Sequence, residues 1–309
     1  MRAAACLIAL CLVAPSVRAD APVLQGPYSV EHQVIHVPGL QISSHKVDCY
    51  FASNSTAPQR FIAFGHGASG GQFIQPFVYK SILTALASWG FVVGAPRACL
   101  EGGLAGCKYY KQQLTLIDWA RKAGAEGHSI MKLVNFTGGV GIGGHSMGGG
   151  STLTDSTAAF GGAAHGIAAA VMLHAFVTGA TPGGSEPPSV PFLAFTGTRD
   201  TTAPPAMTTK FYGAAAAGTP RGLVNKVGAT HQEPTDYKDH KEPYNPRLAQ
   251  YMAAWYKLYV DGWTAAPAGR GAGAPDFPDF REMIFGKGAD SLCGGGDGDM
   301  ETCEMIDGN

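Results

Sequence analysis

The chain carries little charge for its length. Asp, Glu, Lys and Arg make up only 15% of its 309 residues, and the formal net charge is −1. Proteins that bind nucleic acid or anionic lipid need a surplus of Lys and Arg, which a near-neutral chain does not have. We therefore expect no nucleic-acid partner and no electrostatic binding to membranes.

A membrane-spanning segment is missing too. The apolar stretch at residues 3–14 is too short to cross a bilayer. It follows Arg2, and the small residues Val17 and Ala19 suit a signal-peptide cleavage site. We interpret residues 1–19 as a signal peptide and expect a secreted, extracellular protein. An apolar N-terminal strand is the alternative interpretation.

Cysteine is scarce, and no Cys/His spacing resembles a zinc site. Two of the seven cysteines lie in the signal peptide. For an exported chain, the simplest arrangement of the other five pairs Cys99 with Cys107 and Cys293 with Cys303, and leaves Cys49 free. Other pairings remain open, and five reduced thiols would suit a cytosolic protein.

Internal repeats and coiled-coil heptads are absent, and strand patterns alternate with helical patterns instead. Apolar runs predict strands at residues 61–64, 91–93, 140–143, 168–176, 191–196 and 223–227. Apolar side chains at helical spacing predict helices within 78–89 and 110–120, from 147 onward, and within 248–259. This alternation is typical of an α/β fold with a mostly parallel sheet and helices on both faces. We expect one domain over residues 20–263, followed by a Gly/Pro/Asp-rich surface tail over 264–309 that the Cys293–Cys303 disulfide ties down.

Glycine is abundant, with 43 residues, and one Gly-rich segment holds a serine. Residues 144–149 read GHSMGG, which matches the nucleophile-elbow pattern G-x-S-x-G, in which a strand turns sharply into a helix and exposes a serine Oγ. We expect strained φ/ψ at Ser146 and no room for side chains at the flanking glycines. Gly139, Gly141 and Gly144 also match a dinucleotide fingerprint, so an oxidoreductase is an alternative.

An acid and a histidine follow Ser146 at the ends of two later predicted strands. Asp200 follows the strand at 191–196, and His231 follows the strand at 223–227. The carboxyl ends of parallel strands share one edge of a sheet, so the three side chains should meet there. A serine nucleophile needs a base, and the base needs an orienting acid. We predict Ser146 as nucleophile, His231 as general base and Asp200 as orienting acid. A turn residue and one of ten scattered histidines are the alternatives for Asp200 and His231.

A tetrahedral intermediate also needs two N–H donors for its oxyanion. Met147, the residue after the predicted nucleophile, should supply one of them. The Gly-rich loop at residues 65–71 should supply the other, with Ala68 the better candidate and Ser69 the second. A plain Gly-rich turn is the alternative interpretation of this loop.

These motifs resemble the α/β-hydrolase superfamily and, within it, the secreted polyester hydrolases (cutinases and PET-degrading enzymes) and the chlorophyllase- and dienelactone-hydrolase-like esterases. The resemblance covers roughly residues 55–260 and rests on the GHSMGG elbow, on 200–204 (DTTAP) and on 228–231 (GATH). It implies an α/β-hydrolase fold, hydrolysis of carboxylic esters through an acyl-enzyme intermediate, and a C-terminal Cys293–Cys303 bridge. Two departures concern polymer substrates. His66-Gly67-Ala68 lacks the aromatic oxyanion-loop residue of PET-active enzymes, and Phe176 is the aromatic nearest the position of their subsite Trp.

The sequence also predicts how a substrate reaches the site and what the protein binds. About fourteen residues between 176 and 191 show no helical apolar stripe, so we expect no large lid and an open cleft in a monomeric enzyme. Phe176 and Met147 would wall the cleft, and His145 and Phe176 would contact the ester substrate. The acidic stretch 297–301 lacks the register of an EF-hand, so we expect neither metal nor cofactor. A small-ester or chlorophyllase-like esterase and a non-catalytic binding protein of the same fold are the alternatives.

Overall fold

The structure is a computed structural model. It describes residues 25–40, 45–67, 78–97, 109–178, 186–236, 245–263, 278–289, 291–294 and 300–308. Several sequence predictions fall outside these ranges. They are the signal peptide, the oxyanion candidates Ala68 and Ser69, the Cys99–Cys107 disulfide, and residues 179–185 of the segment expected to lack a lid.

A nine-stranded sheet runs through the molecule in the order β1-β2-β4-β3-β5-β6-β7-β8-β9. Its strands are β1 (Val30–His36), β2 (Lys46–Ala52), β3 (Arg60–Gly65), β4 (Phe91–Pro96), β5 (Val140–His145), β6 (Ile167–Leu173), β7 (Phe192–Gly197), β8 (Arg221–Lys226) and β9 (Met300–Ile306). The six strands from β4 to β8 in this order pair in parallel, while β1, β2 and β9 pair antiparallel at the two sides.

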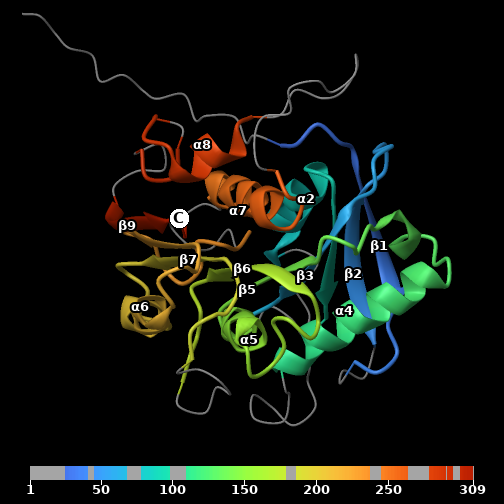
Figure 1. Ribbon diagram of the computed structural model, residues 1–309, viewed down its shortest axis with the longest axis horizontal. Coiled ribbons are helices and arrows are strands. Elements are labelled where there is room, and N and C mark those ends of the chain that lie inside the picture. Colours follow the sequence, from blue (N-terminus) through green and yellow to red (C-terminus); the bar gives the residue numbers. More distant parts are fainter. Residues whose placement is uncertain are drawn as a thin grey trace, which may run out of the picture.

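Helices cover both faces of the sheet (Figure 1). One face carries α2 (Lys80–Ser88), α7 (Pro246–Tyr259) and α8 (Phe280–Phe285), and the other carries α4 (Tyr109–Ala125), α5 (Met147–Ser156) and α6 (Pro205–Ala214). A short 3₁₀ helix (Met131–Leu133) follows α4. The predicted α/β fold with a mostly parallel sheet and helices on both faces is therefore confirmed.

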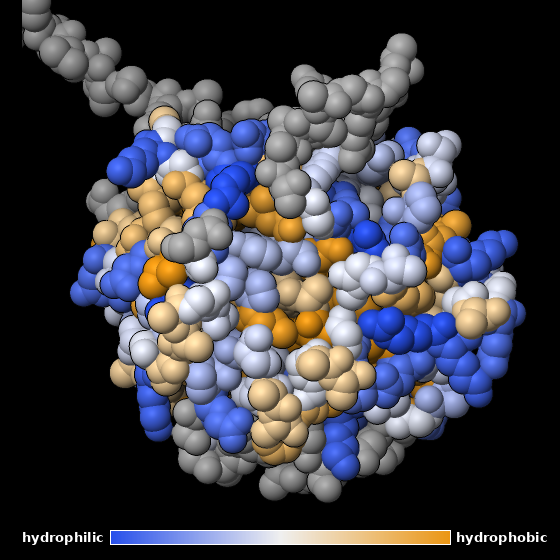
Figure 2. Space-filling model, in the orientation of Figure 1, coloured by the Kyte–Doolittle hydropathy of each residue, from blue (hydrophilic) through white to orange (hydrophobic). Residues whose placement is uncertain are grey.

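Two apolar cores result, one on each face of the sheet. Successive residues of a strand point to opposite faces, so Phe61 of β3 packs into the core beneath α4 and α5, while Ile62 packs beneath α2 and α7. The outer face of α4 is hydrophilic (Figure 2), with Lys122 and, just after the end of the helix, Glu126 largely exposed. Among the described residues, no helix is long and apolar enough to cross a membrane.

The sheet extends beyond the six strands that the sequence predicts. The strand pairing β1–β2 adds two strands at one side, and β2 is almost wholly buried although it contains Asp48. Arg97 binds the Asp48 carboxylate through two 2.8 Å hydrogen bonds, and His32 provides a third. This pairing lets a charged residue sit inside an otherwise apolar strand. At another strand end, β6 stops at Leu173, three residues earlier than predicted.

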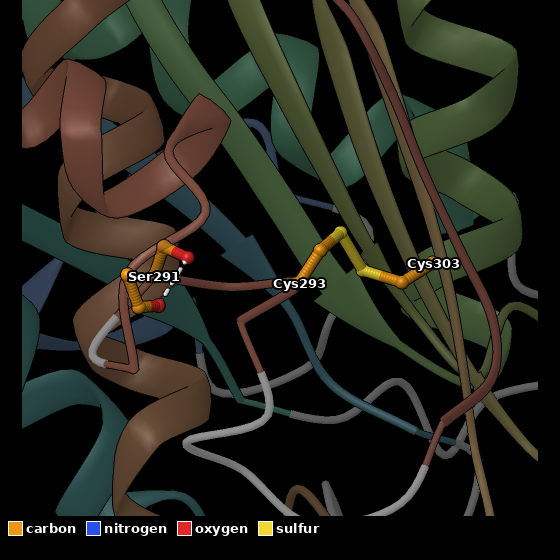
Figure 3. The surroundings of a disulfide bond; sticks show 4 residues. Ser291, Cys293 and Cys303 are labelled. Carbon is orange, nitrogen blue, oxygen red and sulfur yellow. Dashed lines mark hydrogen bonds between the residues drawn. A yellow bond between two sulfur atoms is a disulfide. The ribbon is translucent and has the colours of Figure 1, made fainter.

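The C-terminal segment contributes more structure than the predicted surface tail. Within it, α8 buries Phe280 and Ile284, and β9 pairs with β8 as the ninth strand. The predicted Cys293–Cys303 disulfide is confirmed and joins the loop after α8 to β9 (Figure 3), with the two Cα atoms 5.6 Å apart. Cys49 is a buried thiol that forms no disulfide with another described cysteine.

Candidate active site

Ser146 occupies the sharp turn between β5 and α5. Its backbone has φ 56° and ψ −119°, a conformation that side-chain-bearing residues rarely adopt, so the predicted strain is present. A Cβ at Gly144 would lie 2.6 Å from the Gly148 carbonyl oxygen, and one at Gly148 would collide with the Gly65 carbonyl. Only glycine fits where β3, β5 and α5 converge, as the sequence predicted.

The structure brings Ser146, His231 and Asp200 into one hydrogen-bonded line. His231 Nε2 lies 2.8 Å from Ser146 Oγ, and His231 Nδ1 lies 2.8 Å from Asp200 Oδ2. Ser146 follows β5, while Asp200 follows β7 and His231 follows β8. These strands are parallel, so their carboxyl ends reach the same edge of the sheet. All three residues are at least nine-tenths buried.

The Asp200 carboxylate accepts four hydrogen bonds. Its Oδ1 receives the backbone N–H groups of Thr202 (2.9 Å) and Ala203 (2.7 Å). Its Oδ2 is shared by His231 and by a second histidine, His174, each at 2.8 Å. Burial alone would raise the pKa of Asp200, but the hydrogen bonds from His174 and His231 outweigh it and hold the pKa well below its usual range. Asp200 is therefore ionised.

His174 is a residue of this site that the sequence interpretation missed. It follows β6 directly in a left-handed conformation (φ 46°) and is fully buried. Its Nδ1 donates to Asp200, and its Nε2 lies 3.1 Å from Glu233 Oε2. Burial would lower the pKa of His174, but the hydrogen bonds to the two carboxylates outweigh it and raise the pKa to about 9. His174 is thus an imidazolium with a proton on both nitrogens.

Glu233, two residues after His231, is the other missed residue. Its second oxygen, Oε1, accepts from Asn245 Nδ2 at 2.9 Å and lies 3.2 Å from Lys226 Nζ. Burial would raise its pKa, but the hydrogen bond and charge of His174, the charge of Lys226 and the hydrogen bond from Asn245 together outweigh it, and the pKa falls to about 2. One sequence signal could have found this pair. A polar residue at the carboxyl end of β6 must lie between the strand ends that carry Ser146 and Asp200.

His145 lies within the protein interior, and both of its ring nitrogens have hydrogen-bond partners. Burial, followed by the nearby His231 and His174, holds the pKa of His145 well below its usual value, so the ring is neutral. Its Nε2 donates to the His231 carbonyl (2.7 Å), and its Nδ1 accepts from the Tyr79 hydroxyl (2.7 Å). Tyr79 in turn accepts the Gly67 N–H at 3.0 Å. A contact between His145 and substrate stays a prediction.

Of the other predicted site residues, Met147 and Phe176 lie within the described residues and Ala68 does not. Met147 is the first residue of α5, and N–H groups in the first turn of a helix have no carbonyl partner within that helix. The second predicted oxyanion donor, Ala68, lies outside the described residues. Phe176 lies beside the serine, because its N–H donates to the Ser146 carbonyl at 2.9 Å, and its side chain is partly exposed.

Asp200 and its two histidine partners also have a spacing that a metal ion could use. Ligand atoms of His174, Asp200 and His231 all lie within 4.8 Å of one another. Both histidine Nδ1 atoms, however, bond to the same carboxylate oxygen, and their Nε2 atoms bond to Glu233 and Ser146. The hydrogen-bond network therefore accounts for every ring nitrogen of the group.

Comparisons with known proteins add no family assignment. The sequence matches no protein-family model, and no curated protein is similar to it.

Proposed function

We propose that the protein is a secreted serine hydrolase that cleaves carboxylic esters through an acyl-enzyme intermediate. The observation that carries this proposal is the line of two 2.8 Å hydrogen bonds from Ser146 through His231 to Asp200. A nucleophile bonded to a base, which is bonded in turn to an ionised acid, is the arrangement that serine hydrolases of unrelated folds share. The strained turn at Ser146 adds support, because such strain concentrates at functional sites.

In the proposed acylation step, Ser146 Oγ attacks the ester carbonyl carbon while its proton passes to His231 Nε2. The negative charge on the carbonyl oxygen is met by the Met147 N–H at the positive end of α5 and by a second donor, for which Ala68 is the candidate. His231 then gives its proton to the leaving alcohol as the tetrahedral intermediate collapses. Water, deprotonated by His231, releases the acid in the same way.

Asp200 orients the base throughout this cycle. Its four hydrogen bonds hold the carboxylate rigidly, and it accepts from His231 Nδ1. That bond fixes the tautomer in which Nε2 is free to accept the serine proton. The carboxylate also stabilises the imidazolium that forms during attack.

The substrate class follows from the resemblance to secreted polyester hydrolases and related esterases. We infer bulky or polymeric esters as substrates, with small esters and pigment esters as the alternatives. Hydrolysis rates across p-nitrophenyl esters of rising acyl length, a polyester film and chlorophyll separate these classes.

The catalytic assignment is tested by active-site labelling. A fluorophosphonate should label the secreted protein at Ser146 alone, and Ser146→Ala should lose both the label and at least about 10⁴-fold in kcat with a p-nitrophenyl ester. Ser156→Ala is the matched control, because Ser156 is a buried serine at the far end of the same helix. A non-catalytic binding protein would show neither label nor turnover, and a label on another serine would overturn the assignment.

A further inference from the structure

A row of alternating charges continues from the candidate triad through two buried residues to a partly exposed lysine. Ionised Asp200 is followed by the His174 imidazolium, then by ionised Glu233, and finally by Lys226. His174 and Glu233 are both buried, and neither has a role in the two proton transfers described above. The row therefore requires an explanation beyond the triad itself.

Hydrogen bonding alone does not explain why the second partner of Asp200 carries a charge. Asp200 already accepts from two backbone N–H groups and from His231, so a neutral donor would satisfy its remaining lone pair. Glu233 on the opposite side of the ring makes the difference, because an ionised carboxylate at each nitrogen keeps both protons on His174.

We propose that His174 is a positioning residue that acts through Asp200, and that its fixed positive charge sets the lowest pH at which His231 can serve as general base. The inference rests on the proposed function. A cation on Asp200 Oδ2 offsets part of the negative charge that His231 senses. The protonated form of His231 is then less stabilised, and the neutral form that accepts the serine proton persists to lower pH.

The groups that surround His174 are consistent with this effect. From β5, the neutral ring of His145 has its centroid 6.3 Å away. From the loop after β7 comes Asp200, and from the loop after β8 come Glu233 and His231, the latter with its ring centroid at 6.1 Å. His174 is the cation bound directly to Asp200, while the charge of Lys226 is paired with Glu233.

The kinetic test compares pH profiles of kcat/KM for the wild type and His174→Gln. Glutamine can still donate a hydrogen bond but carries no charge, so the acid limb of the variant should move to higher pH by about two units, as expected for a unit charge roughly 6 Å away at an effective dielectric constant of about 20. His165→Gln is the matched control, because His165 also bonds an aspartate, Asp118, but lies in the loop before β6. An acid limb that coincides with the wild type would overturn the proposal.

A second measurement does not depend on activity. In the Ser146→Ala background, ¹⁵N NMR of the histidine rings should show His174 with both nitrogens protonated at pH 7. Adding Glu233→Gln should make His174 lose its second proton at lower pH. Adding His174→Gln should move the titration midpoint of His231 to higher pH. A singly protonated His174 at pH 7, or an unmoved His231 midpoint, would contradict the inference.

The two tests separate the two claims. If no ester is turned over but the NMR results are as expected, the proposed function fails while the charge relation between His174 and His231 stands. If esters are hydrolysed but neither the acid limb nor the His231 midpoint moves, His174 is only a packing residue. Should His174→Gln fail to fold, the protonation of His174 is compared between the Ser146→Ala protein and the Ser146→Ala/Glu233→Gln protein. This comparison decides whether His174 carries the positive charge that the proposal requires.

Discussion

Two buried histidines beside the candidate site carry different charges although both are shielded from water. His145 contacts a tyrosine hydroxyl and a backbone carbonyl and is neutral, whereas His174 contacts two carboxylates and is cationic. Burial favours the neutral form of both rings, and the two carboxylate partners outweigh it at His174. The motifs and their order along the chain predicted the line from Ser146 to Asp200. The role of His174 was not predicted, because a sequence does not show which groups its ring contacts.

Asp155 is a buried acid with a different fate. It lies in α5 and is fully buried, and neither carboxylate oxygen has a hydrogen-bond partner among the described residues. Burial raises the pKa of Asp155 well above its usual value. The folded state thus binds this proton more tightly than the unfolded chain does, so the contribution to stability is complete below about pH 4 and is lost as pH rises.

Replacing Asp155 with asparagine should remove this pH-dependent loss. The free energy of unfolding of Asp155→Asn, measured by urea titration, should exceed that of the wild type at pH 7, and the difference should shrink toward pH 4. Glu31→Gln serves as a control, because Glu31 is an exposed acid on β1. A difference that is the same at both pH values would mean that Asp155 gains a partner or is ionised at no cost.

At the scale of elements, the central strands and the helices α2, α4, α5 and α7 were predictable, whereas α6, α8 and the outer strands were not. β3 to β7 are buried on both faces and read as apolar or Gly-rich runs, while β8 has a buried apolar pair, Leu223 and Val224, at its centre. β1 is mostly exposed, β2 is interrupted by Asp48, and β9 carries two exposed glutamates among residues that are only half-buried. Such strands are defined by their neighbours, and a single sequence does not show those neighbours.

The Cys293–Cys303 disulfide should stabilise the C-terminal elements. It closes a loop with a sequence separation of 10 residues, for which the chain-entropy model gives roughly 2–3 kcal/mol. The Cys293→Ser/Cys303→Ser variant should therefore unfold at lower urea concentration and lose β9 protection in hydrogen exchange before the central strands. Ser291→Ala is a nearby control, since it removes only a side-chain hydrogen bond to the Gly288 carbonyl (2.7 Å). Equal stability of the double serine variant would contradict the prediction.

At the scale of the whole molecule, access to the sheet edge that carries Ser146 remains a prediction. The described residues 186–190 contain no helix, in keeping with the sequence prediction that no helical lid is inserted before β7. The rate should then climb smoothly as a soluble ester is raised through its critical micelle concentration. A lidded lipase assayed in parallel should show an abrupt increase, and the same increase in this protein would show that a lid exists.

β9 comes last in chain order among the strands of the described sheet, yet it covers the outer side of β8, and His231 follows β8. Until residues 300–306 have been made, β8 presents unpaired backbone N–H and C=O groups, and such an edge readily pairs with strands of other chains. The growing chain therefore keeps an aggregation-prone edge uncovered until residues 300–306 have been made. A protein truncated before Met300 would retain that edge permanently, even though every residue of the candidate triad is present.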